Sequence, residues 1–97
     1  KPMAIGGPMR TRALAMRAHN AGCTPVITTT IDGVVARTGA VHIAASLPTM
    51  TAHGLATADR LATDQGPDPA RVTDGAIAVP QQPGHGVTQI DDRYTPA

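Results

Sequence analysis

Pro25-Val26-Ile27-Thr28-Thr29-Thr30-Ile31 is a run of almost entirely β-branched residues, and Asp32-Gly33 ends it. Because β-branched side chains are restricted at χ1 and pack well on a pleated surface, this run predicts a short strand. A run without polar and apolar alternation is typical of a strand that is buried on both faces, as in a parallel sheet. Asp32 is predicted to cap the helix that follows.

Helical patterns lie on both sides of this predicted strand. The segment 8–21 predicts a helix that begins at a proline and stops at Asn20-Ala21-Gly22. A second helix is predicted over residues 34–47. Residues 53–55 predict a brief strand end, and residues 57–65 predict a short helix. Strands and helices that alternate at this spacing indicate an α/β chain of βα units around a parallel sheet.

The composition of the chain changes after Gly66, where prolines begin to recur. Within this second part, Asp74-Gly75 predicts a turn and residues 76–79 predict an edge strand. The sequence is therefore divided into residues 1–66, which hold the βα units, and residues 67–97, which form a C-terminal tail.

Composition also narrows the function classes. The net charge is +1 at pH 7, which argues against a nucleic-acid-binding surface with its clustered basic groups. No stretch is long and apolar enough to span a bilayer, so we expect no membrane partner. The single cysteine, Cys23, cannot form a disulfide within the chain, which favours a reducing compartment such as the cytoplasm.

Lys1 is the only lysine, and it opens the phrase Lys1-Pro2-Met3-Ala4-Ile5-Gly6-Gly7. The phrase is typical of a strand that ends at a loop, and in (βα) barrels the carboxyl ends of the strands carry the active site. A lysine amine in that place, partly desolvated or beside another cation, can serve as an acid, a base or a fixed cation. Lys1 is therefore the candidate catalytic residue, and a plain surface lysine is the alternative interpretation.

The other candidate residues also lie at predicted strand ends. Thr28 and Thr30 offer hydroxyl and backbone N–H groups that can hold a carboxylate, and Asp32 follows them. Gly54 permits close approach of the backbone to a ligand, and His53 is the histidine predicted to face the same site. Packing of β-branched residues and a simple turn are the alternatives for these two segments. The four histidines lack the spacing of a metal site, so we expect no metal ligand in this chain.

Four phrases, taken in order, resemble the enolase superfamily, and within it the muconate-lactonizing branch and its o-succinylbenzoate synthases. The phrases are Lys1-Pro2…Gly6-Gly7, Thr28-Thr29-Thr30-Ile31-Asp32, His53-Gly54-Leu55-Ala56-Thr57 and Pro83-Gly84-His85-Gly86. Threonines stand in place of the usual serines, and Asp32 stands in place of the usual glutamate. The resemblance covers nearly the whole chain. It implies the C-terminal portion of a (β/α) TIM-type barrel, about its last three βα units, with the tail returning to the capping region.

The resemblance also implies an activity. Lys1 would be the catalytic lysine of the sixth barrel strand, and Thr28 and Gly54 match positions that contact the substrate carboxylate. The reaction would be the dehydration of 2-succinyl-6-hydroxy-2,4-cyclohexadiene-1-carboxylate to 2-succinylbenzoate for menaquinone synthesis. This lyase reaction passes through an enediolate that Mg²⁺ stabilises.

Several parts of such an enzyme are expected outside these residues. The magnesium ligands and a second lysine would lie upstream of Lys1, in the missing N-terminal part of the same protein. We therefore expect residues 1–97 alone to be inactive. We also expect them to fold poorly or self-associate, because strand edges and a helix face would lack their neighbours.

Two alternatives stay open. An N-acylamino acid racemase or a dipeptide epimerase of the same superfamily would use the lysine to exchange a proton with one face of the substrate. The Asp-x-Asp pair of dipeptide epimerases is replaced here by Leu55-Ala56-Thr57-Ala58, which disfavours that activity. The alternative from another class is a non-catalytic α/β binding module. The oligomeric state, including a homo-oligomer, is also left open by the sequence.

Overall fold

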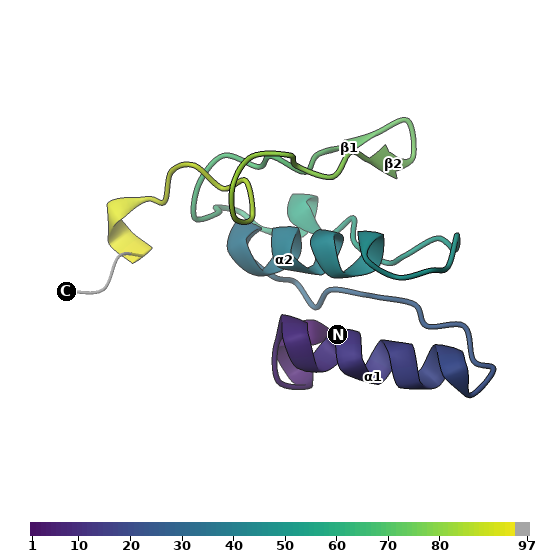
Figure 1. Cartoon of the computed structure of the whole chain (residues 1–97). Helices are drawn as coiled ribbons and strands as arrows, with labels where there is room; N and C mark the ends of the chain where they lie inside the picture. Colours follow the sequence, from purple (N-terminus) through teal and green to yellow (C-terminus); the bar gives the residue numbers. More distant parts are fainter. Residues whose placement is uncertain (95–97) are drawn as a thin grey trace.

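The computed structural model describes residues 1–94, so the last three residues of the predicted tail lie outside the description. Two α-helices, α1 (Pro8–Asn20) and α2 (Val34–Ala45), account for most of the regular structure. Figure 1 shows α2 between α1 and a small hairpin formed by β1 (Val72–Thr73) and β2 (Ala76–Ile77). The α/β class is confirmed. Three short 3-10 helices, η1 (Pro2–Ala4), η2 (Ala58–Arg60) and η3 (Asp92–Tyr94), complete the described elements.

The helix α1 has the bounds that its end signals predict. Pro8 lies in its first turn, where the missing N–H costs nothing. The Thr11 hydroxyl donates a hydrogen bond of 2.8 Å to the Gly7 carbonyl, which holds the first turn to the preceding loop. Gly22 follows the helix with φ of 86°, a left-handed conformation that glycine adopts without steric cost.

The helix α2 also matches its prediction, but its predicted cap is wrong. Asp32 does not cap the helix; its carboxylate is instead paired with the Thr30 hydroxyl. The acceptor for the Val34 N–H is Asp64 Oδ1, at 2.7 Å. A carboxylate that the chain brings back from 30 residues away thus takes the place that the local sequence offered to Asp32.

The β-branched run is much less regular than the predicted strand. Within the described residues it makes a single parallel bridge, in which Thr28 faces Gly54. Its burial alternates, since Ile27 is buried while Val26 and Ile31 are 51% and 61% exposed. The prediction of burial on both faces is wrong because only the face that includes Ile27 packs into the core of this part of the chain.

The predicted helix over residues 57–65 is also largely wrong, because only η2 forms there. The residues that follow η2 hold other parts of the structure together instead. Asp64 caps α2, and the Gln65 carbonyl accepts a hydrogen bond of 2.6 Å from the Asp91 N–H. This segment therefore makes long-range contacts through the Asp64 side chain and the Gln65 backbone.

The tail contains the predicted turn and edge strand in a short form. β1 and β2 pair antiparallel, with Val72 opposite Ile77. The turn between them places Asp74 at φ of 51° and Gly75 at φ of 76°. Two successive positive φ values are the geometry of a type I′ hairpin turn, for which Asp-Gly is a favoured pair. The Asp74-Gly75 pair was therefore sufficient to predict this turn from the sequence.

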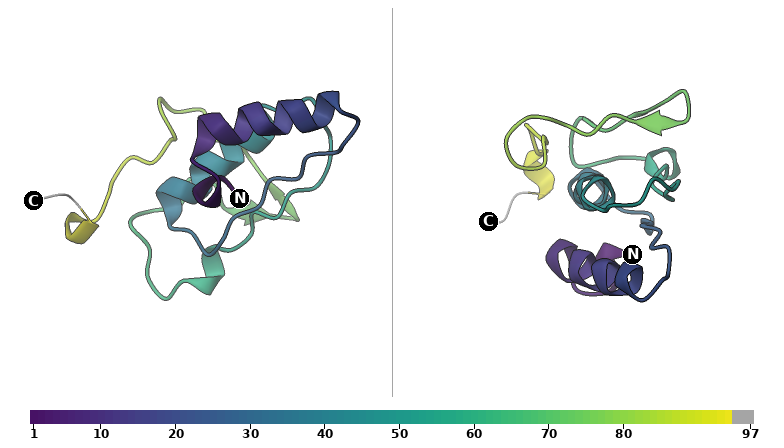
Figure 2. Two further views of the ribbon diagram at one scale, coloured as in Figure 1. Left: turned by 90° about the horizontal axis from the view of Figure 1, so that it is seen from below. Right: turned by 45° about the vertical axis from the view of Figure 1, so that its right-hand side comes forward.

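The core lies on both sides of α2. Its buried hydrophobic residues come from α1, the bridged segments, α2 and the tail. They are Ala15, Ile27, Ala40, Val41, Ile43, Ala44, Leu47, Leu55 and Ala70, with Met16, Ile77 and Val79 packed against them. In the right-hand view of Figure 2, α2 again lies between α1 and the hairpin, and the left-hand view shows the C-terminal segment leading away from the helices. None of the helices in residues 1–94 has the length and hydropathy needed to cross a membrane.

A buried ion cluster joins α2 to the segment after η2. Arg37 is only 2% exposed, and its guanidinium donates to the Asp32 carbonyl at 3.0 Å. The same group forms ion pairs with Asp64 at 3.1 Å and with Asp68 at 3.0 Å. Because a buried guanidinium without partners is very costly, the cluster fixes the residue before α2 and the segment after η2 against the start of α2.

The carboxyl of Asp64 is strongly held in its ionised form. Burial raises its pKa, but hydrogen bonds from the Val34 and Gln65 N–H groups and the Arg37 guanidinium outweigh burial and leave the pKa lowered. This direction matters for stability, because a group whose pKa is lower in the folded chain favours folding when it is ionised.

We expect Arg37→Met to destabilise the fold by about 3 kcal/mol, because it leaves the Asp64 and Asp68 carboxylates without their cation. Urea-induced unfolding followed by circular dichroism measures the change. Arg60→Met, which removes an exposed arginine of η2, is the matched control and should cost less than about 1 kcal/mol. Equal losses for the two variants would contradict a structural role for the cluster.

Acid should weaken the fold through Asp64. The stability that its ionised form contributes is fully present above the ordinary aspartate pKa, and it is lost as the pH falls through the lowered pKa of the folded chain. We expect the free energy of unfolding to fall from about pH 5 toward pH 2. The fall should be smaller in Asp64→Asn, whereas Asp59→Asn on exposed η2 should keep the parent profile. Identical pH profiles of the unfolding free energy for Asp64→Asn and the parent would show that Asp64 does not cause the loss of stability in acid.

Candidate functional site

The candidate site lies at the carboxyl ends of the two bridged segments. The bridge has parallel geometry, because the Gly54 N–H donates to the Ile27 carbonyl at 2.9 Å and the Thr29 N–H donates to the Gly54 carbonyl at 3.0 Å. In a parallel pair both chains run the same way, so the residues after Thr28 and after Gly54 emerge at the same edge. This edge carries most of the residues that the sequence singles out.

Lys1 reaches this edge from the start of the chain. Its Nζ donates a hydrogen bond of 3.0 Å to the Thr29 carbonyl. Pro2 is buried in η1, and the Gly7 N–H donates to the Pro2 carbonyl at 2.7 Å, so the loop that follows Lys1 is held in a compact turn. The ammonium group therefore lies beside the bridge rather than pointing away from the chain.

Three threonines connect the two segments beyond the bridge. The hydroxyls of Thr29 and Thr57 are 2.9 Å apart, and the Thr57 hydroxyl donates to the Thr30 carbonyl at 3.3 Å. A hydroxyl has one proton to donate. The Thr29 hydroxyl can donate its proton to Thr57 or to the Gly54 carbonyl, which lies 3.4 Å away. These bonds fix the carboxyl ends of the two segments relative to one another.

Thr28 and Gly54 fit together closely. A Cβ atom built on Gly54 would lie 2.9 Å from Thr28 Cγ2 and 3.4 Å from Thr28 Cβ. A side chain at position 54 would therefore force Thr28 to shift, whereas the φ angle of Gly54 is not unusual. The predicted close approach at Gly54 exists, but within this chain the group that approaches is the Thr28 side chain.

Thr30 and Asp32 form a second pair at the same edge. The Thr30 hydroxyl donates a hydrogen bond to Asp32 Oδ1; Thr30 is exposed and Asp32 is partly buried. The Asp32 carbonyl is held by Arg37 Nη1. Asp32 therefore presents a fixed backbone and a solvent-accessible carboxylate next to the bridge.

His53 has a different environment from the other predicted site residues. Its Nδ1 accepts a hydrogen bond of 2.9 Å from the Ile27 N–H, which lies before the bridge rather than after it. Its side chain also lines a cavity of about 620 Å³ together with Met50 and Val72. The structure thus brings Lys1, Thr28, Thr30, Asp32 and Gly54 to one edge and gives the His53 ring a backbone partner elsewhere.

Sequence reasoning missed three residues that organise the site. Thr29 lies in the run of three threonines. In extended backbone its side chain points to the other face from those of Thr28 and Thr30, and only this alternation gives Thr29 contacts of its own. Thr57 begins the segment predicted as a helix, but its hydroxyl binds the neighbouring segment. Arg37 lies in a helix of small apolar residues, which is a signal of burial, yet its aspartate partners are 27 or more residues away.

Magnesium does not fit the side chains of this part of the chain. Within residues 1–94 no three side chains of His, Cys, Asp or Glu come together in a group that can hold a metal ion. Mg²⁺ requires several oxygen ligands in near-octahedral geometry, and Asp32 alone supplies one side chain at the candidate site. No step is therefore assigned to magnesium on these residues.

The geometry defines an α/β chain with one lysine at the carboxyl edge of a parallel bridged pair. The family model described as enolase C-terminal domain-like matches residues 1–93. The chain therefore belongs to this family, which is part of the enolase superfamily of enzymes. Neither a search of curated proteins nor a search of solved structures gave a significant match.

We expect Gly54→Ala to destabilise the fold by about 1–3 kcal/mol, because the new methyl group overlaps Thr28 Cγ2. Thr28→Ser removes that methyl group and should restore most of the loss in the double variant. The four free energies of unfolding, measured in urea, form a double-mutant cycle. Additive losses would show that the two side chains do not meet.

Proposed function

We propose that residues 1–97 form the C-terminal part of the active site of an enolase-superfamily enzyme, and that its activity is that of an o-succinylbenzoate synthase. The single observation that carries the proposal is the hydrogen bond from Lys1 Nζ to the Thr29 carbonyl at the carboxyl edge of the bridge. Family membership over residues 1–93 supports the superfamily. The order of the four sequence phrases supports the choice of the synthase.

The connection between the bridged residues supports a barrel. Thr28 and Gly54 pair in parallel, and α2 lies between them in the sequence. A strand, a helix and a parallel strand in succession are the repeating unit of a (β/α) barrel. The proposed barrel places its active site at the carboxyl ends of the strands, and this is the edge to which Lys1, Thr30 and Asp32 belong.

The proposed chemistry assigns Lys1 the role of a fixed cation. Removal of a proton next to a carboxylate places a second negative charge on that group as the enediolate forms. A pre-positioned ammonium group stabilises this charge more than it stabilises the substrate, which lowers the barrier to the reaction. The Thr29 carbonyl holds the ammonium in place through one of its three N–H groups, and the other two remain to bind substrate oxygen atoms.

The threonines and Gly54 have binding roles in this proposal. Thr28 lies directly beside Gly54 on the bridge, so a substrate carboxylate that reaches its hydroxyl also lies close to the backbone of position 54. Thr30 and Asp32 form the border of the site on the side toward α2. The substrate class proposed is a small carboxylate. The magnesium ligands and the proton-abstracting base are proposed to come from other segments of the protein.

Lys1 variants separate the synthase from a racemase. If Lys1 is a cation only, Lys1→Met should lower kcat for dehydration by about 100-fold or more, while Lys1→Arg keeps the charge and loses clearly less. If Lys1 exchanges a proton, as in the N-acylamino acid racemase alternative, both variants should be equally inactive, because a guanidinium does not deprotonate in proteins. Turnover of 2-succinyl-6-hydroxy-2,4-cyclohexadiene-1-carboxylate, followed as 2-succinylbenzoate formation, is the assay.

The same assay has two controls. Thr73→Ala changes an exposed residue of the hairpin and should leave kcat unchanged, and residues 1–97 on their own should show no turnover. Racemisation of an N-acylamino acid by the protein, without dehydration of the cyclohexadiene substrate, would replace the synthase by the racemase. Turnover by residues 1–97 alone would contradict the proposal that other segments complete the site.

A further inference from the structure

The position of the Lys1 ammonium group depends on one backbone carbonyl. Lys1 Nζ donates to the Thr29 carbonyl at 3.0 Å, and within residues 1–94 the ammonium group forms no ion pair. A lysine side chain is long and flexible, so its ammonium group stays in one place only while its acceptor does. The contacts that fix the Thr29 carbonyl therefore also fix the cation.

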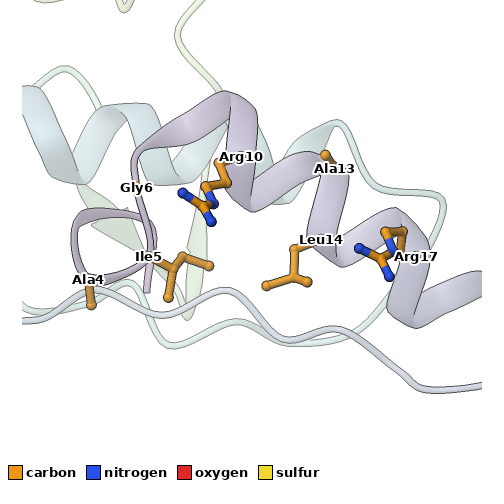
Figure 3. Close-up of a pocket in the computed structure, with 7 residues that line it drawn as sticks. All are labelled: Ala4, Ile5, Gly6, Arg10, Ala13, Leu14 and Arg17. Carbon is orange, nitrogen blue, oxygen red and sulfur yellow. The ribbon is translucent and has the colours of Figure 1, made fainter.

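A second basic region of the chain lies apart from Lys1. A groove of about 650 Å³ is formed between the loop after η1 and α1, and Figure 3 shows the side chains of Arg10 and Arg17 along it. Lys1 is not among the residues that line this groove. Its ammonium group is therefore positioned by the contacts at the bridge, and these are the contacts of Thr29.

Thr29 is held at each of its polar atoms. Its N–H donates to the Gly54 carbonyl at 3.0 Å, and its hydroxyl lies 2.9 Å from the Thr57 hydroxyl and 3.4 Å from the same Gly54 carbonyl. Thr29 is only 5% exposed, so water has little access to replace these hydrogen bonds. Its carbonyl oxygen is the atom that accepts from Lys1.

Thr57 makes contacts that the backbone pairing at Gly54 does not supply. Its hydroxyl lies beyond the bridge, within hydrogen-bond distance of the Thr29 hydroxyl and, at 3.3 Å, of the Thr30 carbonyl. Thr57 therefore contacts the residues on both sides of the peptide unit whose oxygen accepts the Lys1 N–H. Thr57 is itself anchored, because its N–H donates to the Leu55 carbonyl at 3.1 Å.

We propose that Thr57 is a positioning residue for Lys1. It holds the peptide unit between Thr29 and Thr30, so that the Thr29 carbonyl keeps the ammonium group at the carboxyl edge of the bridge. The consequence for catalysis rests on the proposed function, in which a cation that is no longer pre-positioned stabilises the developing enediolate charge less well. Thr57 acts through Thr29, and no contact between Thr57 and the substrate is proposed.

The exchange of the Lys1 ammonium protons with water tests the positioning without any activity. Because Lys1 is the only lysine, labelling with 15N at lysine Nζ gives one side-chain signal in NMR spectra of the full chain. An ammonium group bound to a fixed carbonyl exchanges more slowly than a free one. We expect Thr57→Val, which keeps the shape and removes the hydroxyl, to accelerate the exchange about fivefold, because a hydrogen-bonding group is lost. Thr57→Ser should stay within about twofold of the parent.

Two further variants complete the exchange experiment. Thr73→Val makes the same change on the exposed hairpin and should leave the exchange rate unchanged. Thr29→Val keeps the Thr29 carbonyl and removes the hydroxyl that faces Thr57, so it should also accelerate the exchange, and the two effects should be less than additive in the double variant. Fast exchange in the parent, an unchanged rate in Thr57→Val, or an equal change in Thr73→Val would overturn the proposal.

Activity of the enzyme that contains these residues supplies an independent measurement. Thr57→Val should lower kcat for the dehydration about fivefold and change KM by less than about twofold, because the cation acts mainly in the transition state. When Lys1→Met is already present, Thr57→Val should have no further effect on kcat. An equal loss of kcat with and without Lys1 would overturn the proposal. If the parent does not dehydrate the cyclohexadiene substrate but Thr57→Val accelerates the exchange, the synthase is rejected and the positioning of Lys1 by Thr57 is supported.

Discussion

The burial of one guanidinium group constrains the whole of the described structure. Arg37 lies on α2 among residues that form the core, and its charge cannot be left without partners there. Asp64 and Asp68 supply the opposite charge, and the Asp32 carbonyl supplies a further acceptor. These partners come from both sides of α2 in the sequence, so their convergence on one side chain determines how the chain enters the helix and how it returns.

The candidate site depends on the same cluster. Asp64 accepts the Val34 N–H and binds Arg37, which fixes the first turn of α2 directly after Asp32. The segment between Gly54 and Asp64 must then return toward the start of α2, and this brings Thr57 alongside Thr29 and Thr30. The cluster is not completely satisfied, since Arg37 Nε has no hydrogen-bond partner in residues 1–94. The ion cluster therefore contributes to the placement of the segments around α2 at least as much as it contributes to net stability.

The sequence predicted the elements that depend on local signals, and it did not predict those that depend on long-range contacts. Pro8, Asn20-Ala21-Gly22 and Asp74-Gly75 act on neighbouring backbone, and the elements they predicted are present. The extent of the β-branched run was overestimated, because a strand needs partners along its length and the described residues supply one bridge. The capping of α2 by Asp64 was missed, because no local pattern links positions 34 and 64. Lys1, Thr28 and Gly54 were singled out from predicted strand ends and from the resemblance, whereas the contacts of Thr29 and Thr57 required the register of the bridge.

Two opposite charges lie at different places along the edge that forms the candidate site. Lys1 brings an ammonium group to the bridged edge, while Asp32 places a carboxylate beside the exposed Thr30. If the proposed carboxylate substrate binds at this edge, Lys1 attracts its negative group and Asp32 repels it, which places that group near Thr29. Neutral carbonyls and hydroxyls make up the rest of the edge and can adjust to either end by hydrogen bonding. Under the proposed function, the order of these two opposite charges along one edge would orient the substrate before any other segment of the enzyme contributes to the reaction.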